Sequence, residues 1–514
     1  MMPTFVKQFT GKSMWVIFGS LITLDLLSFL TLHTSVETVL FTASLILLVF
    51  IANKSPEWLF PIAMAEIIAT SNGHSFNTVL FGVSVGLRIA IFAVLVIASG
   101  IKLVRKRENP IPHRYRIVSI LLVAVVIYGA ILGLLNGNGM RNLYLDANGY
   151  LAIGYIFAAW IWVRNADSRR QLFQAVGAGI LWIAIKTLLF LFMFGHLHPK
   201  TLDPIYKWIR DTRLGEVTLQ GGNIYRIFLQ SQWFLVPAML TTAAYIWLAE
   251  RSRETGVRVL FMITFAAILA SLSRSFWVAL VVTVPILAVA VLRWSGWKKF
   301  VNKIPDFAAV KIGTVAMLWV IIAIPIYQST NFSFFSDLFS GRATGVSDVA
   351  IDSRQSLLTP MIDAVIDSPA TGYGLGSTLT YNTSDPRWID DHETNIVETY
   401  AFEWGWLDIW IKFGILGVFA LLWLAFLITQ DLWQLFRIDK PRRWLHLSLL
   451  LSLIGIYVVH FFSPYLNHPI GWGTIAIIIA LIPFEDRRLE AVRVKEPVQA
   501  RRRKRAGVIA RKAD

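Results

Sequence analysis

The chain has 514 residues and contains no cysteine. Without cysteine there is no disulfide bond in any outer loop, no thiolate nucleophile and no cysteine-based metal site. The sequence also lacks a P-loop, a Rossmann glycine pattern and a His-x-x-x-His pair. ATP hydrolysis, dinucleotide binding and tetrahedral zinc chemistry are therefore disfavoured. We expect the protein to use neither a metal nor a cofactor.

Charged residues are scarce, at 16% of the chain, whereas 56% of the residues are hydrophobic. Apolar stretches of about 17 to 23 residues recur from end to end, and stretches of this length cross a bilayer as helices. The first of them, "VIFGSLITLDLLSFL", lacks a small-residue cleavage site and is predicted to be a span rather than a signal peptide. The composition predicts an all-α polytopic membrane protein.

The distribution of the net charge of +16 predicts the topology. Short loops rich in Lys and Arg stay in the cytoplasm. With both termini cytoplasmic and about 12–14 transmembrane helices, every basic segment falls on one side. The tail contains no interleaved aromatic residue, so it is predicted to contact anionic lipids and not nucleic acid. The basic segments are 102–116, 164–170, 250–258, 293–303, 437–443 and the tail from Arg487 to Lys512.

The predicted spans define the organisation of the chain. The run at 57–71 is short and contains a proline, so it either crosses the membrane or re-enters on the same side. The spans are 14–32, 36–53, 57–71, 78–101, 117–134, 147–163, 172–194, 230–249, 258–272, 275–292, 310–327, 406–429, 444–463 and 471–484. The parts are N-terminal transmembrane helices (1–194), an outer loop (195–229), transmembrane helices with two arginines at their outer ends (230–327), a long outer loop (328–405), C-terminal transmembrane helices (406–485) and a basic cytoplasmic tail (486–514).

Two predicted outer segments are too long to be simple connectors. The first, 195–229, departs from the charge rule because it carries several cations. The second, 328–405, is acidic and contains apolar residues at helical spacing, which predicts an amphipathic helix capped by Asp352 or Ser353. The cations are Lys200, Lys207, Arg210, Arg213 and Arg226, and the apolar positions are Leu357, Met361, Ala364 and Val365.

Arg226 and Arg274 both fall at the outer ends of predicted spans. A single arginine at such a place commonly extends to lipid phosphates without a further role. Several outer cations in a chain that otherwise obeys the charge rule favour a second interpretation. Guanidinium groups bind phosphate oxygens bidentately, so the cluster predicts a phosphate-bearing ligand, and its position at the membrane surface indicates a lipid.

The order of these motifs resembles the O-antigen ligase and polysaccharide polymerase superfamily over roughly residues 220–430. The matching segments are "GGNIYRIFLQSQWFLVPAM", "SLSRSFWVALVV", the arginine-containing helix before Pro-x-x-Gly-x-Gly-x-Gly, and "FGILGVFALLWLAFLI". The glycine-rich motif is formed by Pro369, Gly372, Gly374 and Gly376, and the last segment contains the Gly-x-x-Gly of Gly414 and Gly417.

The resemblance implies glycosyl transfer at the outer face of a bacterial inner membrane, from a glycan carried on undecaprenyl diphosphate to a sugar hydroxyl. It implies no metal and no nucleotide. The expected partners are the lipid-linked donor, a glycan acceptor, membrane lipids and other polysaccharide-assembly proteins. The diphosphate would be bound by Arg226, Arg274 and Arg354, with Arg210 and Arg213 in accessory positions, because its developing charge requires preorganised cations.

The position of the catalytic base departs from the family pattern. Ligases of this family place a histidine about three helical turns before Gly-x-x-Gly, and this chain has Glu403 there. His392 is the nearest histidine and the reserve candidate, and Glu398 is an accessory carboxylate. The aromatic neighbours of Glu403 predict a partly desolvated position. A carboxylate base favours a polymerase, and transfer to lipid A core by a ligase is the alternative.

Two other classes of membrane protein are alternatives. A transporter or flippase would show charges in the middle of its spans and internal repeats. Asp25, Arg88 and Lys186 are the candidates for such charges, but the two halves of the chain do not resemble each other. A ten-span peptidoglycan polymerase is disfavoured by the span count and the acidic loop.

Overall fold

The computed structural model describes residues 9–80, 83–107, 109–221, 224–249, 254–323, 349–383, 388–389 and 392–484. Long apolar segments form helices because a helix satisfies its backbone hydrogen bonds internally. The helices are α2 (Lys12–Thr31), α3 (Ser35–Lys54), α4 (Leu59–Thr70), α5 (Leu87–Lys106), α6 (Arg116–Leu135), α7 (Met140–Leu151), α8 (Gly154–Trp162), α9 (Ala166–His196), α10 (Pro199–Asp211), α11 (Leu235–Leu248), α12 (Thr255–Ser271), α13 (Arg274–Ser295), α14 (Trp297–Ala323), α16 (Val349–Asp367), α18 (Gly405–Ile438), α19 (Arg443–Val459) and α20 (Pro469–Ala480).

Short 3-10 helices and three two-stranded antiparallel hairpins complete the described fold. The hairpins pair β1 (Asn77–Leu80) with β2 (Val83–Gly86), β3 (Gly215–Gly221) with β4 (Ile224–Leu229), and β5 (Leu379–Asn382) with β6 (Ile396–Thr399). The 3-10 helices are η1 (Pro56–Trp58), η2 (His113–Tyr115), η3 (Gln230–Phe234), η4 (Lys440–Arg442) and η5 (Tyr465–Asn467).

The prediction of an all-α polytopic membrane protein is confirmed. Within the described residues, nine helices are long and apolar enough to cross a membrane: α2, α3, α5, α6, α9, α13, α14, α18 and α19. The remaining five predicted spans coincide with the shorter helices α4, α8, α11, α12 and α20, of 12, 9, 14, 17 and 12 residues.

Several predicted span boundaries were wrong. The largest difference is at 310–327, where α14 already starts at Trp297. The run at 78–101 begins with the β1–β2 hairpin, and its helix, α5, starts only at Leu87. The run at 147–163 is divided between α7 and α8. The helix predicted at 406–429 continues to Ile438. Apolar runs occur in both strands and helices, which explains why hydrophobicity alone misplaced the start of the span predicted at 78–101.

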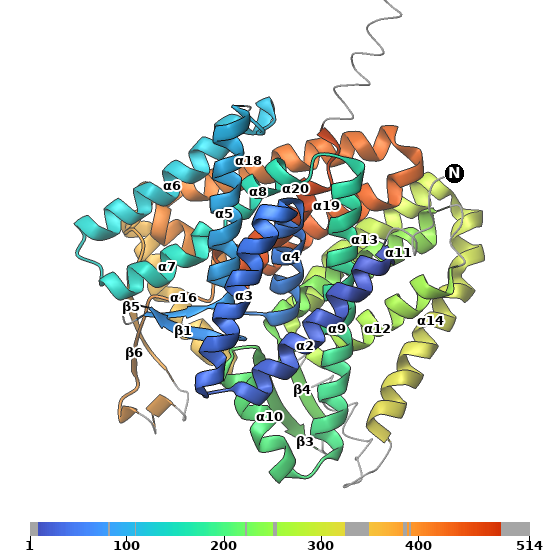
Figure 1. The fold of residues 1–514 in the computed structure, drawn as a ribbon, viewed down its shortest axis with the longest axis horizontal. Helices are drawn as coiled ribbons and strands as arrows, with labels where there is room; N and C mark the ends of the chain where they lie inside the picture. Colours follow the sequence, from blue (N-terminus) through green and yellow to red (C-terminus); the bar gives the residue numbers. More distant parts are fainter. Residues whose placement is uncertain are drawn as a thin grey trace, which may run out of the picture.

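The three hairpins and α10 lie on one side of the molecule, whereas the connection between α5 and α6 lies on the other (Figure 1). We call the first side the hairpin face. Polar contacts join its elements. The Oε1 atom of Glu37 at the start of α3 accepts a hydrogen bond from the backbone nitrogen of Asn77 at 2.8 Å, and His33 contacts Asp211 of α10 at 3.0 Å.

The predicted amphipathic helix is α16. Leu357, Met361 and Ala364 are buried against Phe402 and Ile411, while Val365 is partly buried beside them. The face predicted from spacing is therefore confirmed. The helix starts at Val349, three residues before the predicted cap at Asp352, so that cap assignment was wrong.

The glycine-rich segment after α16 threads between α6 and α18. The backbone nitrogen of Tyr373 donates to the carbonyl of Ile411 at 2.6 Å, and that of Leu375 donates to Gly129 at 2.8 Å. Gly414 has φ of +64°, which interrupts the helical path of α18, and a Cβ there would overlap the carbonyl oxygen of Ala370. The glycines thus allow a close backbone crossing that a larger residue would prevent.

The three charges considered for a transport pathway are paired inside the protein. Lys186 lies 2.7 Å from Asp25, and both are buried. Arg88 is the second residue of α5, near the hairpin face, so the prediction of a mid-span position was wrong. Its Nε and Nη2 atoms donate to the two carboxylate oxygens of Glu66 at 3.0 and 3.1 Å. These contacts indicate a structural role for the pairs, because each buried charge has a partner of opposite sign.

Candidate functional site

Arg226 lies in β4 and reaches the turn between α12 and α13. Its Nε donates to the carbonyl oxygen of Ser271 at 3.1 Å, and its guanidinium lies 4.8 Å from the ring centroid of Phe228. The side chain is 22% exposed, and the Glu216 carboxylate is 3.9 Å away. A strand position beside a partly buried ring holds this guanidinium at the hairpin face with part of its surface accessible.

Arg274 is the first residue of α13, three residues after the carbonyl that Arg226 contacts. Leu272 takes a left-handed conformation in the turn, and Ser273 is the N-cap residue. The structure thus brings Arg226 and Arg274 to the same turn although they are 48 positions apart in the sequence. We call these two residues the arginine pair.

The start of a helix carries a partial positive charge and backbone N–H groups without intrahelical acceptors. Arg274 adds a full positive charge at this end of the 22-residue α13. Arg274 therefore adds to the positive potential at the turn that Arg226 reaches, and a positive helix start of this kind suits a phosphate-bearing ligand.

Glu403 lies immediately before α18 and is exposed, between the buried Phe402 and the half-buried Trp404. The carboxylate lies at the protein surface, so its predicted desolvation at the membrane interface stays a prediction. Phe402 packs in one cluster with Leu357 and Met361 of α16, so α16 adjoins the segment that carries Glu403. Arg354 belongs to the first turns of α16, and its side chain lies outside the described residues.

The segment from His460 to Tyr465 lies between Glu403 and the arginine pair. A Cβ at Gly405 would overlap the backbone and ring of His460, and Trp404 lies 5.9 Å from Phe462 between ring centroids. At the other end, the rings of Tyr465 and Phe276 are 6.5 Å apart, and Phe276 is in the first turn of α13. No pattern in the sequence predicts that this loop contacts both Trp404 and Phe276.

The other carboxylate and the histidine lie on or near the β5–β6 hairpin. Glu398 is exposed in β6, opposite Thr380, and not on the helix of Glu403. His392 is also exposed; its ring stacks on Trp388 at 3.7 Å, and its Nδ1 lies 3.1 Å from the Trp388 carbonyl. Exposure leaves both side chains accessible to a polar substrate.

The accessory arginines are exposed at the end of α10. Arg210 forms a pair with Asp211 at 3.0 Å. The hydrogen bond from His33, together with that from Arg210, lowers the pKa of Asp211. Burial lowers the pKa of His74, and the positive charge of Arg213 lowers it further. Arg213 therefore lies near the β1–β2 hairpin.

A buried charge network beneath Glu403 was missed by the sequence interpretation. The Nζ atom of Lys412 lies 2.6 Å from Asp408 and 2.7 Å from Asp146. Tyr150 donates to Asp408 at 2.9 Å, and Asp146 accepts from the backbone nitrogen of Gly376 at 2.7 Å. The i,i+4 spacing of Asp408 and Lys412 predicts the ion pair between them. No sequence pattern predicts the contact of Lys412 with Asp146 of α7.

This network connects three elements around the start of α18. It joins α7, the glycine-rich segment and α18 through charge-assisted hydrogen bonds, which are stronger than neutral ones. Its three charged groups are almost fully buried, so they are out of reach of a substrate and position the backbone that precedes them. Among the described residues, no group of three or more His, Asp or Glu is arranged to hold a metal ion.

Comparison with known proteins shows that the central part of the chain is similar to a known family. The sequence model of the O-antigen ligase family matches residues 259–422, a range that includes Arg274, the glycine-rich segment and Glu403. The O-antigen ligase of Salmonella typhimurium (strain LT2) is 26% identical over 243 residues, which cover 46% of this chain and 54% of that protein. The alignment thus spans about half the length of this relative. These findings confirm the predicted relationship of the chain to the O-antigen ligase and polysaccharide polymerase superfamily.

Proposed function

We propose that the protein polymerises oligosaccharide repeat units carried on undecaprenyl diphosphate at the outer face of the bacterial inner membrane. The observation that carries the proposal is the convergence of Arg226 and Arg274 at one turn on the hairpin face. The family match supports a membrane glycosyltransferase. The hairpin face is the outer side in this proposal, because the basic segments 102–116 and 164–170 belong to the other face.

The arginine pair stabilises the leaving group in the proposed reaction. The oxygen of the acceptor hydroxyl attacks the anomeric carbon of the donor glycan, and the bond from that carbon to the diphosphate breaks. The lipid diphosphate leaves with the bonding electron pair. Two guanidinium groups and the start of α13 match this developing negative charge without rearrangement, and a diphosphate needs no proton from a general acid. Arg354 is a third candidate ligand.

Glu403 accepts the proton of the attacking hydroxyl in this mechanism. It occupies the family's base position relative to Gly414, and it is accessible. Trp404 and Trp406, which are half-buried beside it, offer apolar faces on which a sugar ring can stack. His392 is the reserve base. A ligase that transfers the glycan to lipid A core is the alternative function, and the name of the Salmonella relative supports it.

The proposal is tested by chain elongation with purified protein and a lipid-linked repeat unit as the donor. Arg226→Ala and Arg274→Ala should each lower the rate by about 10²–10³, the usual effect of removing one charge-stabilising donor. Arg274→Lys keeps the charge but loses the bidentate fork, so it should also be impaired. The measurement is the length distribution and initial rate of polymer formation.

Arg293→Ala is the matched control, because Arg293 lies in the last turn of the same helix, at the end opposite Arg274. It should leave elongation unchanged. Wild-type elongation by Arg226→Ala or Arg274→Ala at normal protein levels would contradict the proposal and return both arginines to contacts with lipid phosphates. Transfer to lipid A core without elongation would instead support the ligase function.

A further inference from the structure

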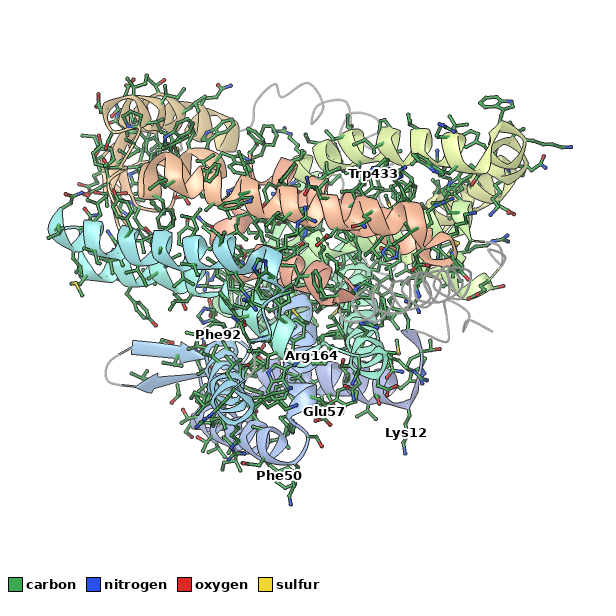
Figure 2. All side chains as sticks on the ribbon, turned by 90° about the horizontal axis from the view of Figure 1, so that it is seen from above. Lys12, Phe50, Glu57, Phe92, Arg164 and Trp433 are labelled. Atoms are coloured by element: carbon green, nitrogen blue, oxygen red, sulfur yellow. The ribbon has the colours of Figure 1, made fainter. Side chains whose placement is uncertain are left out.

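A polar cavity of about 470 Å³ lies on the face opposite the hairpins. It is formed by η1, the last turn of α5, the connection from α8 to α9, and the first turns of α9. Glu57 and Arg164, which both line it, lie close together when the molecule is seen from that face (Figure 2). The other lining residues are Lys102, Lys106, Ile161, Trp162, Asn165, Asp167, Ser168 and Gln171.

One cation of this cavity is held in a defined position. The Nζ atom of Lys102 donates to the carbonyl oxygen of Ile161 at 2.9 Å and lies 3.8 Å from the ring centroid of Trp162. The indole nitrogen of Trp162 donates in turn to Ser99 at 2.8 Å. An ammonium has three donors, and the Ile161 carbonyl uses one of them. The remaining donors are preorganised because the aromatic ring beneath them is fixed.

The charge of the cavity lining favours an anion of charge −1. Lys102, Lys106 and Arg164 contribute three positive charges, and Glu57 and Asp167 contribute two negative ones, which leaves a net charge of +1. Asp167 lies in the first turn of α9, where the helix dipole already offsets part of its charge. A phosphodiester carries one negative charge and accepts the hydrogen bonds that Lys and Arg donate.

Gln171 supplies a second, independent observation. Its Oε1 atom is buried in the cavity wall and has no hydrogen-bond partner among the described residues. A buried acceptor of this kind is costly unless it receives a hydrogen bond. A phosphodiester has no hydrogen to donate. The Gln171 Oε1 atom therefore indicates a ligand that carries a hydroxyl group in addition to the phosphate.

We propose that this cavity binds a hydroxyl-bearing phosphodiester, the chemistry of a phosphatidylglycerol headgroup. The cations are at the end of α5 and before α9, where the basic segments meet the membrane surface, and anionic lipids concentrate at such a surface. A soluble glycerol phosphate carries related chemistry without the acyl chains. The cavity is large enough for a phosphate with a glycerol substituent.

The test is ligand binding to the purified, delipidated full-length protein, followed by native mass spectrometry and thermal shift. The probes are short-chain phosphatidylglycerol, short-chain phosphatidylcholine and glycerophosphoglycerol, the soluble phosphodiester that remains when phosphatidylglycerol loses its acyl chains. Phosphatidylglycerol should bind and raise the melting temperature, and phosphatidylcholine should not. Arg164→Gln should weaken phosphatidylglycerol binding by at least about ten-fold, the effect of losing one charged hydrogen bond.

Arg170→Gln is the matched control. Arg170 is exposed in α9 and belongs to the same basic segment as Arg164, but it does not line the cavity. Equal losses in Arg164→Gln and Arg170→Gln would overturn the proposal, because they would indicate general surface charge. Glycerophosphoglycerol binding as tightly as the lipid would keep the site but assign it to a soluble phosphodiester.

Gln171→Leu tests the hydroxyl contact separately. It should weaken binding of phosphatidylglycerol and leave binding of phosphatidylmethanol, which has the phosphodiester without a free hydroxyl, unchanged. Equal effects on both lipids would overturn this part of the proposal. None of these measurements uses glycosyl transfer, so their outcome does not depend on the proposed function.

Discussion

Glu403 is the residue whose substitution separates catalysis from folding most clearly. Gln has the same size and keeps most hydrogen bonds but removes the basic carboxylate. Because Glu403 is exposed, the substitution should leave folding unchanged. We expect Glu403→Gln to abolish polymer formation while binding of the lipid-linked donor persists. His392→Ala should retain partial activity. Donor binding and elongation are measured on the same preparations.

The opposite pattern would change the assignment of the base. Unchanged elongation in Glu403→Gln together with inactive His392→Ala would move the base to the histidine and favour the ligase mechanism. Glu398→Gln serves as the comparison for a nearby exposed carboxylate, because Glu398 lies in β6, and it should have a smaller effect than Glu403→Gln.

At the scale of elements, the glycine-rich segment determines how α6, α7 and α18 meet. Gly374 has φ of +83°, and a Cβ there would overlap the backbone of Gly133 in α6. Gly374→Ala therefore combines an unfavourable backbone conformation with a steric clash. We expect it to lower the free energy of unfolding by about 2–4 kcal/mol, measured by thermal unfolding in detergent.

Gly137 provides the matched control for this prediction. It has φ of +73°, but no atom lies within 4 Å of a Cβ built on it. Gly137→Ala should therefore cost only the conformational term of about 1–2 kcal/mol. Equal destabilisation in the two variants would show that backbone conformation alone, and not the close crossing of α6, accounts for the effect.

At the scale of the whole molecule, the orientation in the membrane is a prediction from charge. The absence of native cysteine allows single introduced cysteines to be labelled from one side. Thr394→Cys in the long loop should react with a membrane-impermeant maleimide in intact spheroplasts. His113→Cys, in the basic segment 102–116, should react only after the membrane is opened. Labelling is quantified after purification of each variant.

The reverse labelling pattern would invert the topology and place the arginine pair in the cytoplasm, where the proposed donor would not be presented. Both chosen positions are exposed in the structure, so a lack of reaction at one side reports membrane sidedness and not burial.

The sequence alone determined the features that depend on composition and local spacing. Long apolar runs predict helices because backbone groups in hydrocarbon need internal partners, and most of the predicted runs coincide with helices. The buried face of α16 followed from the spacing of Leu357, Met361 and Ala364, because residues three and four apart share one face of a helix. The family relationship followed from the order of a few motifs.

Tertiary structure decided which distant groups meet. Arg226 contacts Ser271 across 45 positions, and Lys412 contacts Asp146 across 266. Local preferences carry no information about such pairs, because they depend on how whole helices pack. The exposure of Glu403 likewise depends on the packing of Phe402 beneath α16. Hydrophobicity and charge thus determine which segments enter the membrane, whereas packing of the helices determines which side chains share a site.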